Sequence, residues 1–536
     1  MISETTKALI VEATAGSGKT TTIVDGLAFA KYGLMPKKML PNGTEVSAYK
    51  VSQEQKDIWE WLEREIRDGK CDNVLVCSFS KAIADTLKER LKFGEASTIH
   101  SLGCKVMREN NIRTKLNNGF KTINLFLEYT ENKDLKTLSK DMRTILDDVK
   151  EVVKMCKDNV MTENDVDELS LRTMFIDREY EAQTATDVLV PIIKYVLEKG
   201  SKLPEVGVKR GPFDKGSRGG ILEIDYDDMI YIPARYDFHT KFDMMIIDES
   251  QDVSYGKLKL ILGQDCDRYV YVGDPNQAIM AFAGAMCNSM ERIHDSIENV
   301  EVLPLSYTYR CGKAIVAEAK KIVGDAINAG EGNCEGKISY IKESEMELEV
   351  GDMLVSRVNA PLISLAWRLV KEKKNVLVVG HEIGVGLVRL INKQNTKDND
   401  DVIVLCNKIE EWREHQIKLL QNKKSDTSGQ QIAVGDKADC IVTVAGECHS
   451  VKLLKDFIKL IFDNNLPCIR LSSIHRAKGL EAKRVFFYDP SNVPHKMAKS
   501  KEAKKQEMNL KFVAITRAIE ELVYVEVEKK TVAVEI

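Results

Sequence analysis

Short runs of apolar residues alternate along the chain with longer stretches whose apolar residues recur at helical spacing. In the first half, such runs occur at 8–12, 73–79, 244–248 and 269–273. A second series follows at 353–356, 375–380, 484–488 and 522–527. Runs that are apolar at nearly every position are typical of parallel strands covered by helices on both faces. The pattern therefore predicts an α/β fold with two tandem cores, each built on a parallel sheet.

Two stretches interrupt this alternation. Residues 111–216 show helical periodicity rich in Lys, Asp and Leu, whereas 384–465 are polar and weakly patterned. We interpret both as inserted, mainly helical subdomains, the second one short. The expected organisation is a first core at 1–110 and 217–300 with the insertion 111–216, and a second core at 301–383 and 466–536 with the insertion 384–465.

Composition narrows the classes of function. The 536 residues exceed what one core usually holds, and 43% hydrophobic with 30% charged residues is ordinary for a globular protein. No apolar run is long enough to span a bilayer, no signal peptide is recognisable, and the 12 cysteines are scattered. We therefore expect a cytoplasmic protein without a membrane partner. The net charge of −4 argues against a broadly basic surface, so a nucleic acid would bind in a local groove.

The segment ATAGSGKT at 13–20 follows an apolar run and precedes a helical stretch. Its small residues let backbone N–H groups approach phosphate oxygens, and the N-terminus of the helix favours their negative charge. Lys19 would reach the β- and γ-phosphates, and the Thr20 hydroxyl would coordinate Mg²⁺. The sequence thus predicts ATP and Mg²⁺ as cofactors. The residues expected to bind ATP in this segment are Ala15, Gly16, Ser17, Gly18, Lys19, Thr20 and Thr21.

An acidic pair ends the apolar run at 244–248. Asp248 would hold Mg²⁺ through water, and Glu249 would orient and deprotonate the attacking water. Two carboxylates directly after four apolar residues are costly unless a cation compensates them. Gln277, in the string GDPNQ at 273–277, can sense the γ-phosphate by hydrogen bonding.

Two arginines, Arg310 and Arg517, lie in the second block of sequence. Arginine stabilises the charge that develops on a transferring phosphoryl group, and it is commonly supplied by a neighbouring domain. A nucleotide site built from two blocks can couple hydrolysis to movement. A motor is therefore the leading hypothesis.

Taken together, the ordered strings resemble superfamily 1 helicases of the UvrD/Rep type. The resemblance runs in collinear order through nearly the whole chain, and the order is more specific than any one string. The strings are AGSGKT at 15–20, SFSKA at 78–82, STIHSL at 97–102, DYDDM at 225–229, the stretch 272–285, LSYTYR at 305–310, LVSRVN at 354–359, SIHRAKGLE at 473–481 and FVAITRA at 512–518.

The resemblance implies roles for further residues. Tyr309 would stack on adenine, Arg310 would contact the γ-phosphate, and Arg517 would act as the arginine finger. Gly479 and Glu481 would approach the γ-phosphate and the ribose. The residues matching the family's single-stranded DNA contacts are Phe79, His100, Tyr226, Phe282, Arg357 and His475. Aromatic faces suit this task because stacking tolerates any base.

The resemblance also implies the architecture and the activity. We expect two RecA-like P-loop cores that bind ATP and Mg²⁺ between them, and an ATP-dependent DNA helicase or translocase of 3′→5′ polarity. Its partners would be single-stranded DNA and duplex junctions. A second hypothesis is a DNA-stimulated ATPase subunit that serves a nuclease or a repair or replication protein, with little unwinding of its own.

Two more hypotheses stay open at this point. A P-loop kinase or small-molecule NTPase would need neither Arg517 nor Phe282, and RNA could replace DNA as the track. The chain also departs from the family. Thr21 and Ala283 occupy positions where the family often has arginine, and no glutamine precedes the phosphate loop. The string SQEQKDIW at 52–59 is either a displaced adenine-recognition segment or a capped amphipathic helix.

Overall fold

The computed structural model describes residues 7–39, 45–68, 71–117, 119–167, 185–204, 220–279, 288–394, 396–421, 428–463 and 466–527. Within these ranges the chain forms two compact units. The first contains 7–13, 19–275 and 288–305, and the second contains 14–18, 276–279 and 306–527. No helix in the described part of the chain is both long and apolar enough to cross a bilayer.

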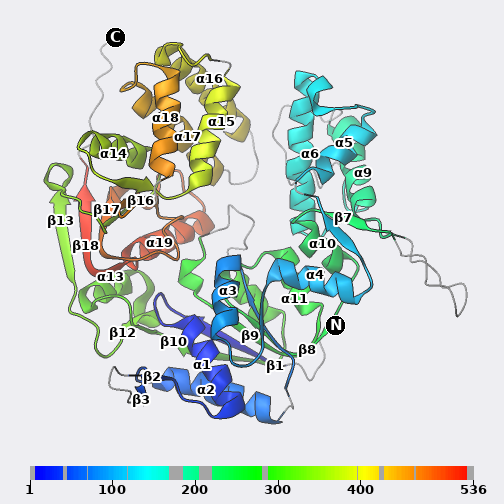
Figure 1. Ribbon diagram of the computed structural model, residues 1–536, viewed down its shortest axis with the longest axis vertical. Helices are drawn as coiled ribbons and strands as arrows, with labels where there is room; N and C mark the ends of the chain where they lie inside the picture. Colours follow the sequence, from blue (N-terminus) through cyan, green and yellow to red (C-terminus); the bar gives the residue numbers. More distant parts are fainter. Residues whose placement is uncertain are drawn as a thin grey trace, which may run out of the picture. The chain divides into compact units, whose positions relative to one another are not determined.

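The first unit is built on a six-stranded sheet in which all neighbouring strands are parallel. In spatial order the strands are β10 (Val300–Leu305), β1 (Lys7–Ala13), β9 (Asp265–Gly273), β8 (Lys241–Ile247), β4 (Val74–Ser78) and β5 (Glu95–Thr98). Figure 1 shows them with the helices that accompany them. These helices are α1 (Lys19–Tyr32), α2 (Gln53–Asp68), α3 (Lys81–Arg90), α4 (Ile99–Glu109), α10 (Asp228–Arg235), α11 (Tyr255–Leu262) and α12 (Ser289–Asp295).

Both faces of the first sheet are buried because its central strands are apolar at successive positions. In β1, Leu9 and Val11 belong to a core with residues of α1 and α2. Ala8 and Ile10 point to the opposite face and belong to a second core with residues of α4, α10 and α11. Alternate side chains of a strand face opposite sides, so a continuous apolar run fills two layers at once.

A helical subdomain interrupts the first unit. It contains α5 (Lys121–Tyr129), α6 (Lys140–Asp158) and α9 (Val190–Ser201), which pack together (Figure 1). Its entry and exit strands, β6 (Thr114–Leu116) and β7 (Leu222–Ile224), pair in parallel. The subdomain therefore closes at Ile224, beyond the expected limit at 216, because the exit strand pairs with the entry strand. A separate antiparallel pair, β2 (Lys37–Met39) and β3 (Glu45–Ser47), follows α1.

The second unit repeats the plan with a second six-stranded parallel sheet. Its order is β13 (Lys337–Lys342), β18 (Ala518–Glu526), β17 (Ala482–Tyr488), β14 (Met353–Ser356), β16 (Ile469–Ser473) and β15 (Val376–Val378). One face packs on α13 (Lys313–Val323) and α19 (Lys501–Ile515). The other face packs on α14 (Ala360–Lys371) and on α15 (His381–Lys393), α16 (Val402–Gln421), α17 (Ser428–Ala445) and α18 (Val451–Phe462). A short pair, β11 (Tyr307–Thr308) and β12 (Asn328–Ala329), opens the unit.

The predicted fold class, α/β with two parallel sheets, is confirmed. Two further expected domain limits are wrong, however. The limit at 300/301 cuts β10, whose residues pair with β1 across Ala8–Val300 to Ala13–Leu305. The limit at 383/384 cuts α15, whose Leu387, Leu390 and Ile391 belong to the same apolar core as the second sheet. Both errors arose because the apolar pattern shows that an element exists but not what it packs against.

Helix packing at Gly103 generates a stability prediction. A Cβ at this position in α4 would lie 1.7 Å from the Met229 carbonyl oxygen, whereas a Cβ at Gly435 in α17 would have nothing within 4 Å. We expect Gly103→Ala to destabilise the first unit by about 1–3 kcal/mol through overpacking. Gly435→Ala should stabilise α17 by up to about 1 kcal/mol. Urea unfolding combined with hydrogen exchange of peptides from α4 and α17 measures both. Equal shifts of the same sign would contradict the packing argument.

Candidate active site

The phosphate loop joins β1 to α1. Gly16 and Gly18 have φ of 73° and 79°, a left-handed conformation that side chains disfavour. Ser17 is fully buried, and its Oγ donates to the Thr14 carbonyl at 2.9 Å. Helix α1 begins at Lys19, directly after the second glycine. The loop thus presents a helix N-terminus next to two backbone positions free of side chains, an arrangement suited to phosphate.

Lys19 and Thr20 meet the predicted acidic pair within the first unit. Lys19 Nζ lies 3.3 Å from Glu249 Oε1, and Thr20 Oγ1 donates to Asp248 Oδ2 at 3.0 Å. Burial disfavours the charge on Lys19, yet Glu249, Asp274 and Asp248 raise its pKa. Burial, together with the neighbouring Glu249, raises the pKa of Asp248 to about 6. Three acidic residues thus face one ammonium, and a further cation would relieve the excess negative charge.

The residues here fit Mg²⁺. Thr20 Oγ1 and Asp248 Oδ2 are adjacent oxygen donors, the ligand type that Mg²⁺ prefers. Mg²⁺ is usually held by one or two carboxylates together with substrate phosphates rather than by a protein cage. The described residues contain no cluster of three or more His, Cys, Asp or Glu that could hold a metal ion.

Glu249 has a strained backbone, with φ 54° and ψ 42°. A non-glycine residue in this left-handed region is uncommon and is often found where function requires an exact side-chain position. Its carboxylate is held by Lys19 and by Gln251, whose Nε2 donates to Glu249 Oε2 at 2.5 Å. Gln251 Oε1 accepts from the Asp274 backbone N–H at 2.9 Å. Gln251 is therefore a site residue that the sequence reasoning missed, although it lies only two residues after Glu249.

Two residues predicted to be catalytic meet in the second unit. Arg517 Nη2 donates to Gln277 Oε1 at 3.4 Å, although 240 residues separate them. Arg517 is only 1% exposed, and its Nε and Nη1 donate to the Val513 and Leu480 carbonyls. Lys478 Nζ donates to the Gln277 carbonyl at 2.9 Å, a contact without a predicted role. The guanidinium is thus oriented by groups of the protein itself.

Arg310 and Glu481, assigned to different parts of the nucleotide, bind each other. Arg310 Nε lies 2.6 Å from Glu481 Oε2. The preceding residue, Tyr309, donates its backbone N–H to the Gly16 carbonyl at 2.9 Å, which ties it to the phosphate loop. Its ring is 44% exposed and packs against Gly330, where a Cβ would lie 2.6 Å from the ring. Gly479 has φ 84° and is exposed, and a Cβ added there would have nothing within 4 Å.

Two polar residues support the first turn of α1. Arg90 Nη2 donates to Thr21 Oγ1 at 3.1 Å, so a guanidinium from α3 reaches the position where the chain lacks the family's arginine. Gln55 Nε2 donates to Thr22 Oγ1 at 3.0 Å. Gln55 also forms a reciprocal cap with Ser52, since Gln55 Oε1 accepts from Ser52 N and Ser52 Oγ accepts from Gln55 N. The string at 52–59 is therefore a capped amphipathic helix whose glutamine is 2% exposed and bound to α1.

Three predicted nucleic-acid contacts lie in the first unit. Phe79 follows β4 and is half-buried against the core. His100 lies in the first turn of α4, where burial and the nearby Lys257 and Lys154 lower its pKa. Tyr226 lies between β7 and α10 and is 59% exposed, so its ring face is available for stacking. Phe282, the fourth aromatic candidate, lies outside the described residues.

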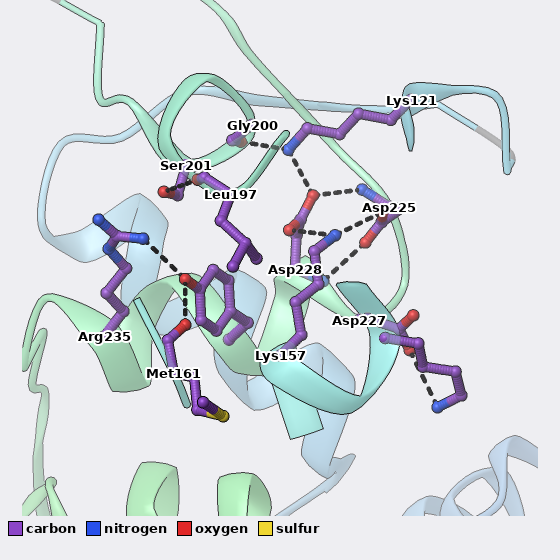
Figure 2. A network of polar contacts seen from close by, with 12 residues as sticks. Lys121, Lys157, Met161, Leu197, Gly200, Ser201, Asp225, Asp227, Asp228 and Arg235 are labelled. Atoms are coloured by element: carbon purple, nitrogen blue, oxygen red, sulfur yellow. Dashed lines mark hydrogen bonds and ion pairs between the residues drawn. The ribbon is translucent and has the colours of Figure 1, made fainter. Parts of the chain in front are cut away.

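A buried ionic network holds the segment that carries Tyr226 (Figure 2). Lys157 Nζ lies 2.7 Å from Asp225 Oδ2 and 2.8 Å from Asp228 Oδ1, and Lys121 Nζ lies 2.5 Å from Asp228 Oδ2. Asp225 and Asp228 also accept each other's backbone N–H groups. Burial disfavours the charge on Lys157, but the two carboxylates raise its pKa. Helices α5 and α6 of the inserted subdomain thereby fix the exposed tyrosine at the start of α10.

The two remaining candidates are less accessible than expected. Arg357 is 8% exposed and forms a bidentate ion pair with Glu507 of α19, with an Nη2–Oε1 distance of 2.7 Å. This guanidinium joins the end of β14 to α19, so Arg357 forms an internal ion pair in this structure. His475 is half-buried; burial, with Arg357 and Arg476 nearby, lowers its pKa to about 3, so its ring is neutral at physiological pH.

Comparisons with known proteins agree on one family. Residues 58–298 match the UvrD/REP helicase N-terminal domain, and residues 449–529 match the UvrD-like helicase C-terminal domain. The chain is 21% identical over 291 residues to the ATP-dependent DNA helicase Rep of Buchnera aphidicola subsp. Acyrthosiphon pisum (strain APS), covering 50% of this chain and 40% of that protein. It is 24% identical over 129 residues to the Rep helicase of Escherichia coli (strain K12), covering 22% of this chain and 19% of that protein.

These matches cover less than half of the length of the curated relatives. The phosphate loop at 13–20 lies outside both matched domains, so its assignment rests on its own geometry. A solved structure of arterivirus nonstructural protein 10 (helicase) with DNA aligns with 97% of this chain and 61% of that chain, at 10% identity and a TM-score of 0.29. A TM-score this low supports no argument.

The buried network of Lys121 and Lys157 with Asp225 and Asp228 leads to a second stability prediction. Lys157→Met leaves two buried carboxylates facing one ammonium, and breaking a buried pair in this way costs about 3–5 kcal/mol. Lys154→Met, one turn earlier on α6, removes only exposed contacts with Asp158 and Asp227 and should cost about 0–1 kcal/mol. Urea unfolding measures both variants. Equal losses for the two lysines would contradict a supporting role specific to the buried network.

Proposed function

Since this chain belongs to the UvrD/Rep-like superfamily 1 helicases, we propose that it is an ATP-dependent single-stranded DNA translocase and DNA helicase. The observation that supports this most directly is the pairing of Lys19 with Glu249 and of Thr20 with Asp248 next to a phosphate loop. The family resemblance favours 3′→5′ movement. We retain the scheme of two RecA-like cores with inserted subdomains, with the limits corrected at β7, β10 and α15.

In this proposal each residue has a defined task. Lys19 binds the β- and γ-phosphates, and Thr20 with Asp248 holds Mg²⁺, which neutralises phosphate charge when bound. Glu249 orients water and accepts its proton. Its strained backbone and its bond from Gln251 support this task because both restrict where the carboxylate can lie.

The second unit contributes the arginines. Arg517, oriented through Gln277, Val513 and Leu480, stabilises the charge on the transferring phosphoryl group. Arg310 is held by Glu481 before nucleotide binds, and we propose that the γ-phosphate replaces this carboxylate as its partner. Through this exchange, a contact of the second unit changes when ATP binds and is restored after hydrolysis. A motor requires such a change.

The first test is steady-state ATPase activity with and without single-stranded DNA. We expect stimulation by DNA, and we expect Glu249→Gln to lower the stimulated rate by about 10²-fold or more because the general base is lost. Glu60→Gln, the same substitution at an exposed position of α2, is the matched control and should leave the rate unchanged. Turnover that ignores DNA would contradict the proposal and favour a small-molecule NTPase.

Unwinding of a duplex with a 3′ single-stranded tail distinguishes an autonomous helicase from an ATPase subunit. A helicase separates the strands in an ATP-dependent manner and prefers the 3′-tailed over the 5′-tailed substrate. Stimulated turnover without unwinding would instead identify a DNA-stimulated ATPase subunit. Such a subunit would depend on a nuclease or a repair or replication partner for strand separation.

A further inference from the structure

A lysine without a predicted role covers the ring of Phe79. Lys257 Nζ, from the first turn of α11, lies 4.5 Å from the centroid of the Phe79 ring. Both residues are half-buried. Among the described residues, Lys257 has no carboxylate within ion-pair distance, and the aromatic ring is the cation's identified contact. An ammonium partly removed from water with only a ring as partner is incompletely compensated.

Charged groups of both signs surround Lys257. Burial and the nearby Lys154 of α6 lower the pKa of Lys257. Burial, Lys257 and Lys154 in turn lower the pKa of His100 in α4. Three carboxylates also face this group: Asp158, Asp227 and Asp252. Asp158 and Asp227 already lie 3.0 and 3.7 Å from Lys154 Nζ. Asp158 and Asp227 are thus bound to Lys154, whereas the printed contact of the Lys257 ammonium is the Phe79 ring, so an anion can serve as an additional partner for Lys257.

Lys105, in the same unit, also lies over an aromatic ring, but its contacts are purely structural. Lys105 Nζ lies 5.1 Å from the centroid of the Phe242 ring, but it is also 3.0 Å from Glu95 Oε2. Phe242 is fully buried and offers no face to a ligand. Phe79, by contrast, is half-buried at the carboxyl end of β4. The ring beneath Lys257 can therefore accept another partner once the ammonium leaves it.

We infer that Lys257 is a binding residue for the backbone of single-stranded nucleic acid and that it exchanges partners when the strand binds. Without the strand, its ammonium covers the face of Phe79. With the strand, a base stacks on that face and the ammonium binds an adjacent phosphate. This inference deepens the proposed function and rests on it, because it requires that the strand passes Phe79.

The salt dependence of binding tests the exchange. Affinity for a fluorescent oligothymidylate would be measured by anisotropy over a range of salt concentrations, for the wild type, Lys257→Ala and Lys257→Arg. Loss of one phosphate contact lowers the slope of log affinity against log salt by about 0.7 for a single strand. We expect this reduction and a several-fold weaker affinity at low salt for Lys257→Ala. Lys257→Arg, which keeps the charge, should retain the wild-type slope.

Two controls separate charge from stacking and from folding. Lys105→Ala removes a lysine over a ring in the same unit and should leave both slope and affinity unchanged. Phe79→Leu should weaken binding while leaving the slope unchanged, because it removes stacking but no phosphate contact. Thermal melting verifies that each variant is folded, and Lys257→Gln replaces Lys257→Ala if the alanine variant melts early.

The outcomes are distinguishable. If the wild type binds the strand but both neutral variants keep its salt slope, the role of Lys257 is overturned while the proposed function stands. If the wild type does not bind single strands at all, the proposed function and this inference both fail. A reduced slope in Lys105→Ala as well would also overturn the inference, since the effect would then reflect overall charge.

Discussion

Parallel pairing of the strands is the constraint on which the candidate sites depend. In a parallel sheet every strand ends at the same edge, and ligands of open α/β sheets bind outside these carboxyl ends. In the first sheet, β1 leads into the phosphate loop, β8 into Asp248 and β9 into Asp274. The next two strands, β4 and β5, lead into Phe79 and His100. The residues of the first unit that are candidates for binding nucleotide and nucleic acid therefore share one edge, because they follow neighbouring strands of the same sheet.

Buried charges are balanced in the networks that support the fold, whereas they are unbalanced in the candidate nucleotide site. Arg357 with Glu507, and the two lysines with Asp225 and Asp228, balance cations against carboxylates through several hydrogen bonds. At Lys19 one ammonium faces three acidic residues, and the pKa of Asp248 is raised to about 6. A balanced network is complete without a ligand and holds elements together. An unbalanced one has a favourable interaction still to make, which in this site suits a divalent cation.

Two cations near the candidate sites are held by partners from the protein itself. Arg310 binds Glu481, and Lys257 lies on the Phe79 ring. Each partner lowers the cost of an uncompensated charge near a site that is expected to receive phosphate. In the proposed exchange each would be released when phosphate binds, so that ligand binding would change a contact within the protein. Arg517 differs because the Val513 and Leu480 carbonyls and the Gln277 side chain orient its guanidinium and need not be replaced when phosphate binds.

Features that depend on residues adjacent in the chain could be predicted from the sequence. The phosphate loop, the acidic pair after β8 and the α/β class all follow from short strings and apolar runs, because glycine conformations, strand burial and helix starts depend on neighbours in the chain. The family resemblance added specific roles for Tyr309, Arg310 and Arg517 by the order of their strings. It also assigned Arg357 to DNA, although the folded protein uses this guanidinium to bind Glu507.

Only the tertiary structure decided which distant residues meet. The contact of Gln277 with Arg517, the bond of Gln55 to Thr22 and the position of Lys257 over Phe79 join segments that no local pattern connects. The same holds for the limits of the units, since β10 and α15 are assigned by what they pair with or pack against. Local propensity and apolar spacing specify the elements. Pairing, burial and charge balance between elements are properties of the folded chain, and these determine what each side chain is free to do.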